Sequence, residues 1–407
     1  MIIIPKKVHL KIRLITSFEM GRNFVKKKKK MNIDEYLEQM KEIQEKIIQL
    51  LDTNEDSETH FENLQKILED FKIRFDKQKI KSLLYLIARI SQHHFQYPSF
   101  YDKLLKILML FIDEIKLYFS SSEVLKIFQK NKRIILFFIE EEIIMMNEQI
   151  AEKMISNENY IKYFYPELKH FMNKEKRDHY YREEYDESNL EQFNAKRKIG
   201  KNDNYIAQLI QNDSIAEFVE HVNKSNISIE ETYIPKSIFE TNSLLAKFNT
   251  PLLNYTLFYG SIQIFKYLYL NGAKLSPYNW IYAIHGRNHE IIHFLEEKKI
   301  EPNIKIKILK TAIKCHHNEI AVYIIENYLY QKIEPKFFKF YNFFYIKKEM
   351  LNSATFVKLC QYDHYYIVKY LLESGDIDVN IIHSILKNIL FIHEIYIIFI
   401  LILFFMN

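Results

Sequence analysis

Apolar residues recur every three or four positions from Asn32 onward, which is the period of an amphipathic α-helix. A first stripe covers residues 33–51, a polar break covers 52–57, and a second stripe covers 61–71. The same pattern predicts further helices at about 79–94, 99–119, 121–128 and 132–146. Because the connections are short, we expect residues 31–172 to form a helical N-terminal domain whose neighbouring helices pack antiparallel.

Residues 173–200 have a different character, since fourteen of these 28 residues are Asp, Glu, Lys or Arg. Such a charge density is typical of a solvated surface, which predicts a charged linker or an exposed helix. A specific charged interaction site is the alternative. Residues 201–248 then predict a helical cap, because Asn212, Asp213 and Ser214 supply a turn and an N-cap between two apolar stretches.

Four segments within residues 249–380 follow one pattern when they are aligned on a single isoleucine. In each, small or apolar residues end one helix, a polar turn of three to five residues follows, and Ile-x-x-x-Leu/Ile opens a second helix. The anchor residues are Ile264, Ile291, Ile320 and Ile367. The second apolar positions are Leu268, Leu295, Ile324 and Leu371. The pattern therefore predicts helical hairpins.

A hairpin of this kind cannot bury both of its apolar faces alone, so neighbouring hairpins must stack to complete a core. Small residues that let the first helices approach closely stand at Thr256, Ala283 and Ala312. Gly272 and Gly375 end the second helix of their segments, where a left-handed cap is favoured. We expect Leu268→Asp to unfold the stack, because it buries an unpaired charge.

This pattern resembles the ankyrin repeat. Thr250-Pro251-Leu252 resembles its opening Thr-Pro-Leu, and IVKYLLESGDIDVN, which ends at Asn380, resembles its closing residues. The anchor isoleucines are 27, 29 and 47 residues apart, whereas an ankyrin repeat has about 33 residues. The short spacings leave little room for β-turn fingers, and the long one predicts an insertion near residues 331–350.

The resemblance extends to a large protozoan protein family over about residues 31–380. The phrases that carry it include NDNYIAQLIQNDSIAEFVEHV and NWIYAIHGRNHEIIHFLEE. Members of this family pair an uncharacterised helical N-terminal domain with ankyrin repeats. The resemblance implies an all-α chain, in which a helical N-terminal domain is followed by an ankyrin-type α-solenoid. It implies no catalytic residues and leaves the cellular role open.

Composition supports a folded helical chain. The sequence is 48% hydrophobic and 27% charged, with only 6 Gly and 8 Pro, which argues against loop-rich sandwiches and barrels. The net charge of +5 is modest, and the basic residues are interspersed with acidic ones, so we expect no nucleic-acid partner. Cys315 and Cys360 cannot form a disulfide framework, which favours the reducing cytoplasm.

Both ends of the chain are unusual. Residues 1–30 predict a poorly structured basic extension, in which Lys26 to Lys30 form a nuclear-import signal or a solvated run, unless the natural chain begins at Met31. Residues 381–407 predict an apolar C-terminal helix. Only twelve apolar residues follow Glu394, against about 20 needed to span a bilayer, so a buried terminal helix or a reading-frame artefact is favoured over a membrane anchor.

Histidine is the residue type that suggests a metal site. His285, His289 and His293 are spaced by four, Cys315, His316 and His317 follow, and Cys360 and His364 come later. The repeat register, however, places a turn at Gly286 to Asn288, which breaks the helical spacing and favours capping roles. No phosphate-binding loop, nucleophile elbow or kinase motif is present in the sequence, and paired carboxylates lie on polar helix faces. We therefore expect no metal, no cofactor and no small-molecule substrate.

These patterns favour a non-enzymatic scaffold that binds another protein through the first helices and the turns of the stack. The candidate contact residues are Tyr255, Tyr282, Arg287, Asn288 and Lys314. Trp280 stands at a core position, so packing is favoured over a role as a binding hot spot. The alternatives are a membrane-tethered adaptor that uses residues 389–406, and a metal-dependent or nucleic-acid-linked activity.

Overall fold

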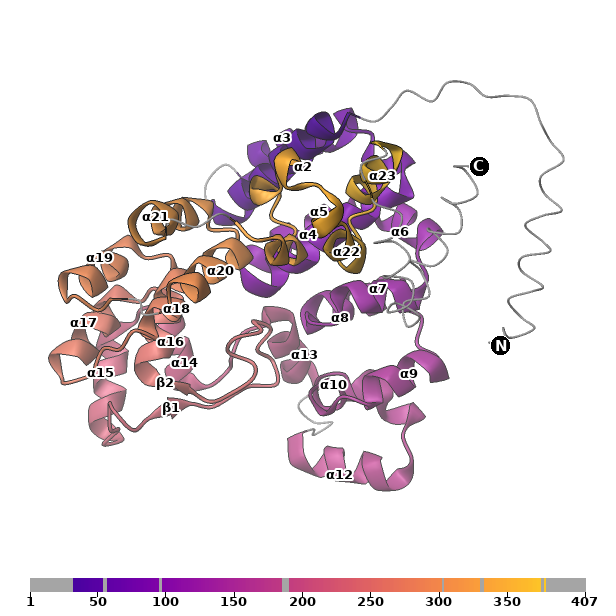
Figure 1. The fold of residues 1–407 in the computed structure, drawn as a ribbon. Helices are drawn as coiled ribbons and strands as arrows, with labels where there is room; N and C mark the ends of the chain where they lie inside the picture. Colours follow the sequence, from indigo (N-terminus) through magenta and orange to yellow (C-terminus); the bar gives the residue numbers. More distant parts are fainter. Residues whose placement is uncertain are drawn as a thin grey trace, which may run out of the picture.

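The computed structural model describes residues 32–53, 57–94, 97–184, 190–301, 304–329, 333–374 and 377. The expectations for residues 1–30, Gly375 and residues 381–407 lie outside this part of the chain. The predicted all-α fold is confirmed: in the described residues, the strands are β1 (Tyr233–Ile234) and β2 (Thr250–Pro251), which pair antiparallel (Figure 1). None of the described helices combines the length and the apolar character needed to cross a bilayer.

The N-terminal half is a group of helices that follow the predicted apolar stripes. They are α2 (Ile33–Asp52), α3 (Ser57–Asp70), α4 (Lys77–His93), α5 (Phe100–Met109), α6 (Ile112–Tyr118), α7 (Ser121–Phe128), α8 (Lys132–Glu140), α9 (Glu148–Ile155), α10 (Glu158–Tyr163) and α11 (Tyr165–Leu168). Helix α2 begins where the Asn32 side chain accepts hydrogen bonds from the amides of Asp34 and Glu35. Its apolar stripe is buried in the core.

Two of the predicted helices are wrong in extent. Residues 99–119 form two helices, because the amides of Leu110 and Phe111 bond only three residues back, which ends α5 in a tightened turn and buries Phe111. Residues 132–146 form a shorter helix, because the amides of Ile143 and Ile144 both donate to the carbonyl of Phe138 and close α8 after Glu140.

The charged segment forms α12 (Lys174–Glu184) and α13 (Leu190–Ile199). Residues 174–179 are exposed, which suits their charge. Helix α13 instead buries Phe193 and Arg197, and the Arg197 guanidinium donates to both carboxylate oxygens of Glu167 at 3.0 and 2.8 Å. This ion pair fixes α13 against the N-terminal helices.

The C-terminal half is a row of helical hairpins. They are α14 (Tyr205–Gln211) with α15 (Ile215–Lys224), α16 (Leu252–Tyr259) with α17 (Ile262–Leu270), α18 (Asn279–Gly286) with α19 (His289–Glu297), α20 (Lys305–Cys315) with α21 (Asn318–Tyr328), and α22 (Ser353–Gln361) with α23 (Tyr365–Ser374). Three short 3₁₀ turns precede the last hairpin: η4 (Pro335–Phe340), η5 (Phe343–Tyr345) and η6 (Lys348–Met350). Figure 1 shows α14, α16, α18 and α20 in one row, with α15, α17, α19 and α21 outside it.

One turn geometry recurs along this row. Six residues between a first and a second helical segment adopt the left-handed conformation, with φ between 50° and 66°. They are Asp213, Gly260, Arg287, His316, Tyr341 and Asp363. Each of the four predicted anchor isoleucines follows such a residue by four positions and is at most 4% exposed. The predicted register of the four hairpins is therefore confirmed.

Consecutive turns are tied together by side chains. The residue that follows the left-handed position bonds to a backbone carbonyl of the preceding unit. The pairs are Ser261 with Ile210 (2.6 Å), Asn288 with Gly260 (2.9 Å), His317 with Ile284 (2.9 Å), Asn342 with Ile313 (3.0 Å) and His364 with Phe338 (2.8 Å). A carbonyl only accepts, so each of these side chains donates.

The 47-residue interval between Ile320 and Ile367 differs from the expected insertion. It contains a complete turn at Tyr341, which lies 25 residues after His316 and 22 before Asp363. The short segment η4 takes the place of a first helix and packs between α20 and α22. Sequence periodicity missed this unit because its helices are short 3₁₀ segments and because Tyr345, not isoleucine, stands at the anchor position.

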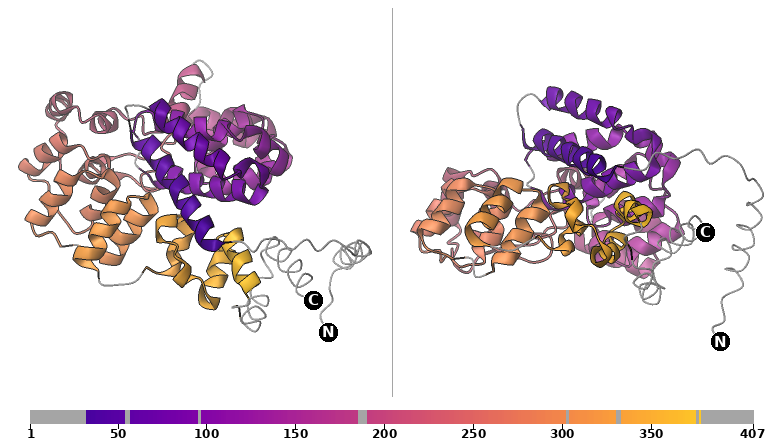
Figure 2. Two further views of the ribbon diagram at one scale, coloured as in Figure 1. Left: turned by 90° about the horizontal axis from the view of Figure 1, so that it is seen from above. Right: turned by 45° about the horizontal axis from the view of Figure 1, so that its top comes forward.

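Two apolar cores meet along the row. One lies under the hairpins from Ile206 to Tyr345, and the other lies under the N-terminal helices but also takes in residues from Phe338 to Ile377. Helix α23 packs against α2 and α4, and α2 packs against η5. Figure 2 shows α2 passing between the other N-terminal helices and the last units. The last units therefore share a core with the N-terminal helices instead of forming a separate domain with the other hairpins.

Candidate functional site

The five predicted contact residues fall in different environments, of which Tyr282 occupies a partly buried one. Tyr255 is 1% exposed and its hydroxyl accepts a hydrogen bond from Gln211 at 3.0 Å, so it belongs to the core and not to a contact surface. Asn288 caps α19 by accepting from the amide of Ile291 at 3.2 Å, so its side chain is committed to the turn. Trp280 is buried, as predicted, and its indole donates to the carbonyl of Ile300 at 2.6 Å.

Arg287 joins the hairpin row to the N-terminal helices. Its Nε donates to Glu319 of α21 at 2.7 Å, and its Nη1 donates to Asp52 at the end of α2. Asp52 is also held by Nε2 of His94 at 2.7 Å. Burial opposes ionisation of Asp52, but His94 and Arg287 outweigh burial and keep the pKa of this carboxyl below its ordinary value. Arg287 therefore contacts its own chain at the position where an external partner was expected.

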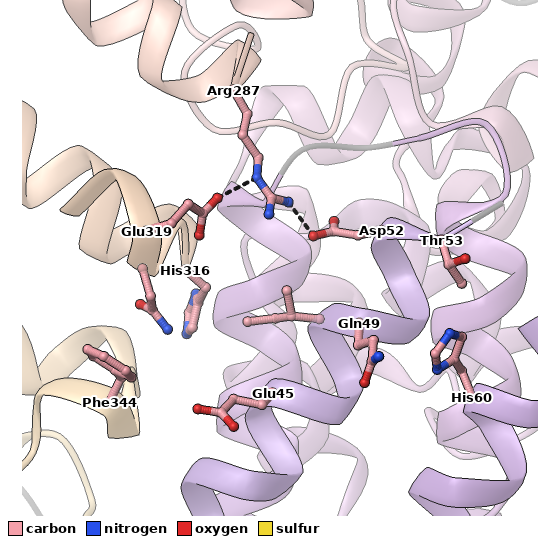
Figure 3. Close-up of a pocket in the computed structure, with 11 residues that line it drawn as sticks. Glu45, Gln49, Asp52, Thr53, His60, Arg287, His316, Glu319 and Phe344 are labelled. Carbon is pink, nitrogen blue, oxygen red and sulfur yellow. Dashed lines mark hydrogen bonds and ion pairs between the residues drawn. The ribbon is translucent and has the colours of Figure 1, made fainter. Parts of the chain in front are cut away.

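A pocket of about 570 Å³ opens beside this ion-pair network. It lies between α2 and α3 on one side and the turns and second helices of the row on the other (Figure 3). Its lining residues are Glu45, Ile48, Gln49, Asp52, Thr53, His60, Arg287, His316, Asn318, Glu319 and Phe344. These residues come from parts of the chain that are far apart in sequence, so only the folded chain forms the pocket.

His316 is the unusual member of the pocket wall. It is the left-handed residue that ends α20, it is 2% exposed, and neither of its ring nitrogens has a partner with good hydrogen-bond geometry. Burial, followed by repulsion from His94, lowers the pKa of His316 to about 3, although nearby carbonyls of Tyr341 and Lys314 act in the opposite direction. The ring is therefore neutral at pH 7, with one nitrogen able to donate and the other able to accept.

The histidines and cysteine of the metal hypothesis lie in separate places. His285 ends α18 and His289 opens α19, so the turn breaks their helical spacing, as predicted. The Cys315 sulfur lies 3.3 Å from Nδ1 of His285. Burial raises the pKa of Cys315 to about 12, which keeps it a thiol. Within the described ranges, no three His, Cys, Asp or Glu residues are grouped so that they can hold a metal ion.

A second feature is a cluster of lysines beside α20, which we call the basic face. Its members are Lys130 between α7 and α8, Lys247 between β1 and β2, Lys310 and Lys314 on α20, and Lys339 on η4. Figure 1 shows these segments around the centre of the molecule. None of these lysines forms an ion pair with an acidic side chain in the described part of the chain.

The lysines of the basic face repel one another. Burial lowers the pKa of Lys314, and the charges of Lys310 and Lys247 lower it further, although Cys315 acts in the opposite direction. Burial, followed by Lys310 and Lys130, likewise lowers the pKa of Lys339. Repulsion of this kind requires that the four segments bring their ammonium groups close together. Lys314 is the predicted contact residue that lies in this face.

Comparison of the chain with protein-family models, with curated proteins and with solved structures finds no match. Function must therefore be argued from the pocket and the basic face themselves. Sequence reasoning singled out Arg287 and Lys314, but it could not bring together the other residues of the pocket or of the basic face. Asp52 and Arg287 are 235 residues apart, and the members of the basic face come from four separate segments. The sequence could have predicted that His317 and His364 occupy equivalent turn positions, because the register places both directly after the left-handed residues.

Proposed function

We propose that this chain is a non-enzymatic protein-binding scaffold whose stacked hairpins are of the ankyrin type. The recurring turn and the ladder of side chains between turns support a row of equivalent units, which is the architecture of a solenoid. The resemblance to protozoan ankyrin-repeat proteins points in the same direction. The two buried thiols suit the cytoplasm as the place where the scaffold works.

The basic face is the surface that we propose for the partner, and the observation that carries this is five lysines that form no ion pair with an acidic side chain of the described residues. Unneutralised, mutually repelling charges cost folding free energy, so their presence favours a ligand of opposite charge. A duplex would need a longer basic stripe along its phosphates. The compact basic face instead fits an acidic segment of another protein, which Lys310, Lys314 and Lys339 would hold.

A charge-reversal pair tests the basic face. In Lys310→Glu/Lys339→Glu, the affinity of the full chain for a fluorescein-labelled oligoglutamate peptide should fall about tenfold or more, measured by anisotropy. The matched control is Lys224→Glu/Lys266→Glu, which makes the same change in net charge at exposed positions of α15 and α17. Its affinity should stay within about twofold of the parent.

Two outcomes would contradict the proposed surface. An equal loss of affinity in both double variants would show that only the net charge matters. Tighter binding of a single-stranded oligonucleotide, lost in the same Lys310→Glu/Lys339→Glu variant, would assign the basic face to nucleic acid instead of an acidic protein segment.

A further inference from the structure

We infer that the pocket between α2 and the turns at Arg287 and His316 is a binding site for a cationic group, an alkylammonium or a guanidinium. This site is distinct from the basic face, since no lysine of that face lines the pocket. Each can therefore be present without the other.

The first argument is the unsatisfied hydrogen-bonding capacity of His316. Its ring is buried on the pocket wall and faces α2, with Glu45 and Gln49 on the opposite side (Figure 3). Buried ring nitrogens nearly always have a partner, because removing them from water without one is unfavourable. The carbonyls of Tyr341 and Lys314 can accept only from the N–H of the neutral ring, so its other nitrogen still lacks a donor, which a group that enters the pocket would supply. A neutral imidazole nitrogen accepts an N–H from such a group without repelling its positive charge.

The second argument is the charge of the lining. Glu45, Asp52 and Glu319 bring three carboxylates to the pocket, whereas Arg287 brings one guanidinium. That guanidinium is already shared by Asp52 and Glu319, so it is not available to an incoming anion. Glu45 is exposed at the pocket rim and makes no ion pair within the described residues. An entering cation meets unpaired negative charge there, and an entering anion would be repelled.

The third argument is the apolar part of the wall. Ile48 and Phe344 also line the pocket, and the Lys41 ammonium of α2 lies over the Phe344 ring, 5.5 Å from its centroid. An aromatic ring and an aliphatic side chain suit the methylene stem of a lysine or arginine side chain, whose charged end then reaches Glu45 and His316. The volume of about 570 Å³ falls within the range of pockets that bind small ligands, about 300–1,000 Å³. The same chemistry comes from a basic side chain of a partner protein or from a free amine.

Calorimetric titration of the full chain tests the site with three probes. They are agmatine and butylammonium as free cations, and an arginine-containing peptide blocked at both ends. We expect saturable binding, and preference for the blocked peptide over agmatine would identify a partner side chain as the source. Acetate, as a matched anion, should not bind.

Variants on α2 separate the pocket from general charge. Glu45→Gln should weaken agmatine binding about tenfold, since it removes the carboxylate that has no other partner. Glu42→Gln is the control, because Glu42 is exposed on the same helix and does not line the pocket. Its affinity should stay within about twofold of the parent chain. Both positions are exposed, so neither change threatens the fold.

Nuclear magnetic resonance of the imidazole nitrogens gives an independent readout. Agmatine should shift the ¹⁵N signals of His316 and leave those of exposed His289 in place. The inference is overturned if no cationic probe binds at millimolar concentration, if acetate binds instead, or if Glu42→Gln and Glu45→Gln have equal effects. Binding that leaves the His316 signals unchanged would also overturn it, because the ligand would then lie elsewhere.

Discussion

The turns at Ser261 and His317 occupy equivalent places in the hairpin row but have different surroundings. Both side chains donate to a backbone carbonyl of the preceding unit, at 2.6 and 2.9 Å. Ser261 follows Gly260 between α16 and α17, near the beginning of the row. His317 follows His316 in the part that α2 and α4 cover, and its ring packs edge-on against His94, with 5.1 Å between ring centroids. The hydrogen bond requires a donor, and the surroundings decide which donor is used.

The comparison explains why buried histidines gather at the later turns. A serine satisfies the carbonyl but reaches no further. An imidazole satisfies the carbonyl and also fills the space between the turn and the N-terminal helices. His364 has the same role against the carbonyl of Phe338, at 2.8 Å. The turns at His317 and His364 are consequently sensitive to the protonation of histidine, whereas the turn at Ser261 is not.

The largest expected effect is loss of stability in acid. Burial lowers the pKa of His364 to about 4 and that of His316 to about 3, and holds the pKa of His317 well below its ordinary value. In the unfolded chain a histidine has a pKa of about 6.5, so it becomes protonated as the pH drops below that value. The folded state resists this protonation, so the unfolded state binds more protons and the free energy of unfolding falls. His364 alone should account for about 3 kcal/mol by pH 4.

Urea unfolding at pH 7.5 and at pH 4.5 measures this loss. His364→Gln, which keeps a donor but does not titrate in this range, should reduce the difference between the two pH values. A free energy of unfolding that does not change with pH would contradict the neutral, buried state of these histidines.

The next largest effect is expected when the side chain that donates to the preceding unit is removed at one covered turn and, for comparison, at the turn of Ser261. His317→Ala should cost about 3 kcal/mol, because it leaves the Ile284 carbonyl unpaired and opens a cavity beside His94. Ser261→Ala removes the same kind of hydrogen bond without a large cavity and should cost about 1 kcal/mol. Unfolding free energies at pH 7.5 give both values. Equal losses would show that burial by the N-terminal helices adds nothing at the later turn.

Substitutions at two glycines test how closely α16 and α18 approach each other. A Cβ on Gly286 would lie 2.2 Å from the carbonyl oxygen of Leu257, so Gly286→Ala should push α16 and α18 apart and cost about 2 kcal/mol. A Cβ on Gly272 meets nothing within 4 Å, and only its φ of 97° is unfavourable. Gly272→Ala should therefore cost about 1 kcal/mol. Thermal unfolding of both variants measures the two losses. A larger loss for Gly272→Ala than for Gly286→Ala would contradict this packing.

The smallest effect is expected at Arg287. Its ion pairs with Asp52 and Glu319 are partly exposed, so Arg287→Ala should cost only about 1 kcal/mol. The loss should shrink in high salt, because salt screens exposed charges. Lys266→Ala removes an exposed ion pair with Glu290 and should have almost no effect. A salt-independent loss at Arg287 would indicate packing and not charge as the link to α2.

The sequence predicted the hairpins because four isoleucines repeat at a constant distance from a polar turn. It did not predict the unit at Tyr341, because 3₁₀ turns are too short to show periodicity. The shared turn could not be recognised from glycine, the residue that left-handed positions favour. Among the six left-handed turn residues only Gly260 is a glycine, and residues such as Arg287, His316 and Asp363 stand at the others. No local pattern in the sequence could predict that α2 and α4 cover the later turns, because Asp52 and Arg287 meet only in the folded chain.

Gln44 and Asn342 mark the place where α2 covers the unit at Tyr341. Gln44 donates to Oδ1 of Asn342 at 2.9 Å and accepts from the amide of Phe343 at 2.7 Å. A double-mutant cycle with Gln44→Met and Asn342→Ala, followed by urea unfolding, tests this contact directly. We predict a coupling free energy of about 1 kcal/mol or more. Losses that add to within about 0.3 kcal/mol would mean that α2 does not dock on this turn.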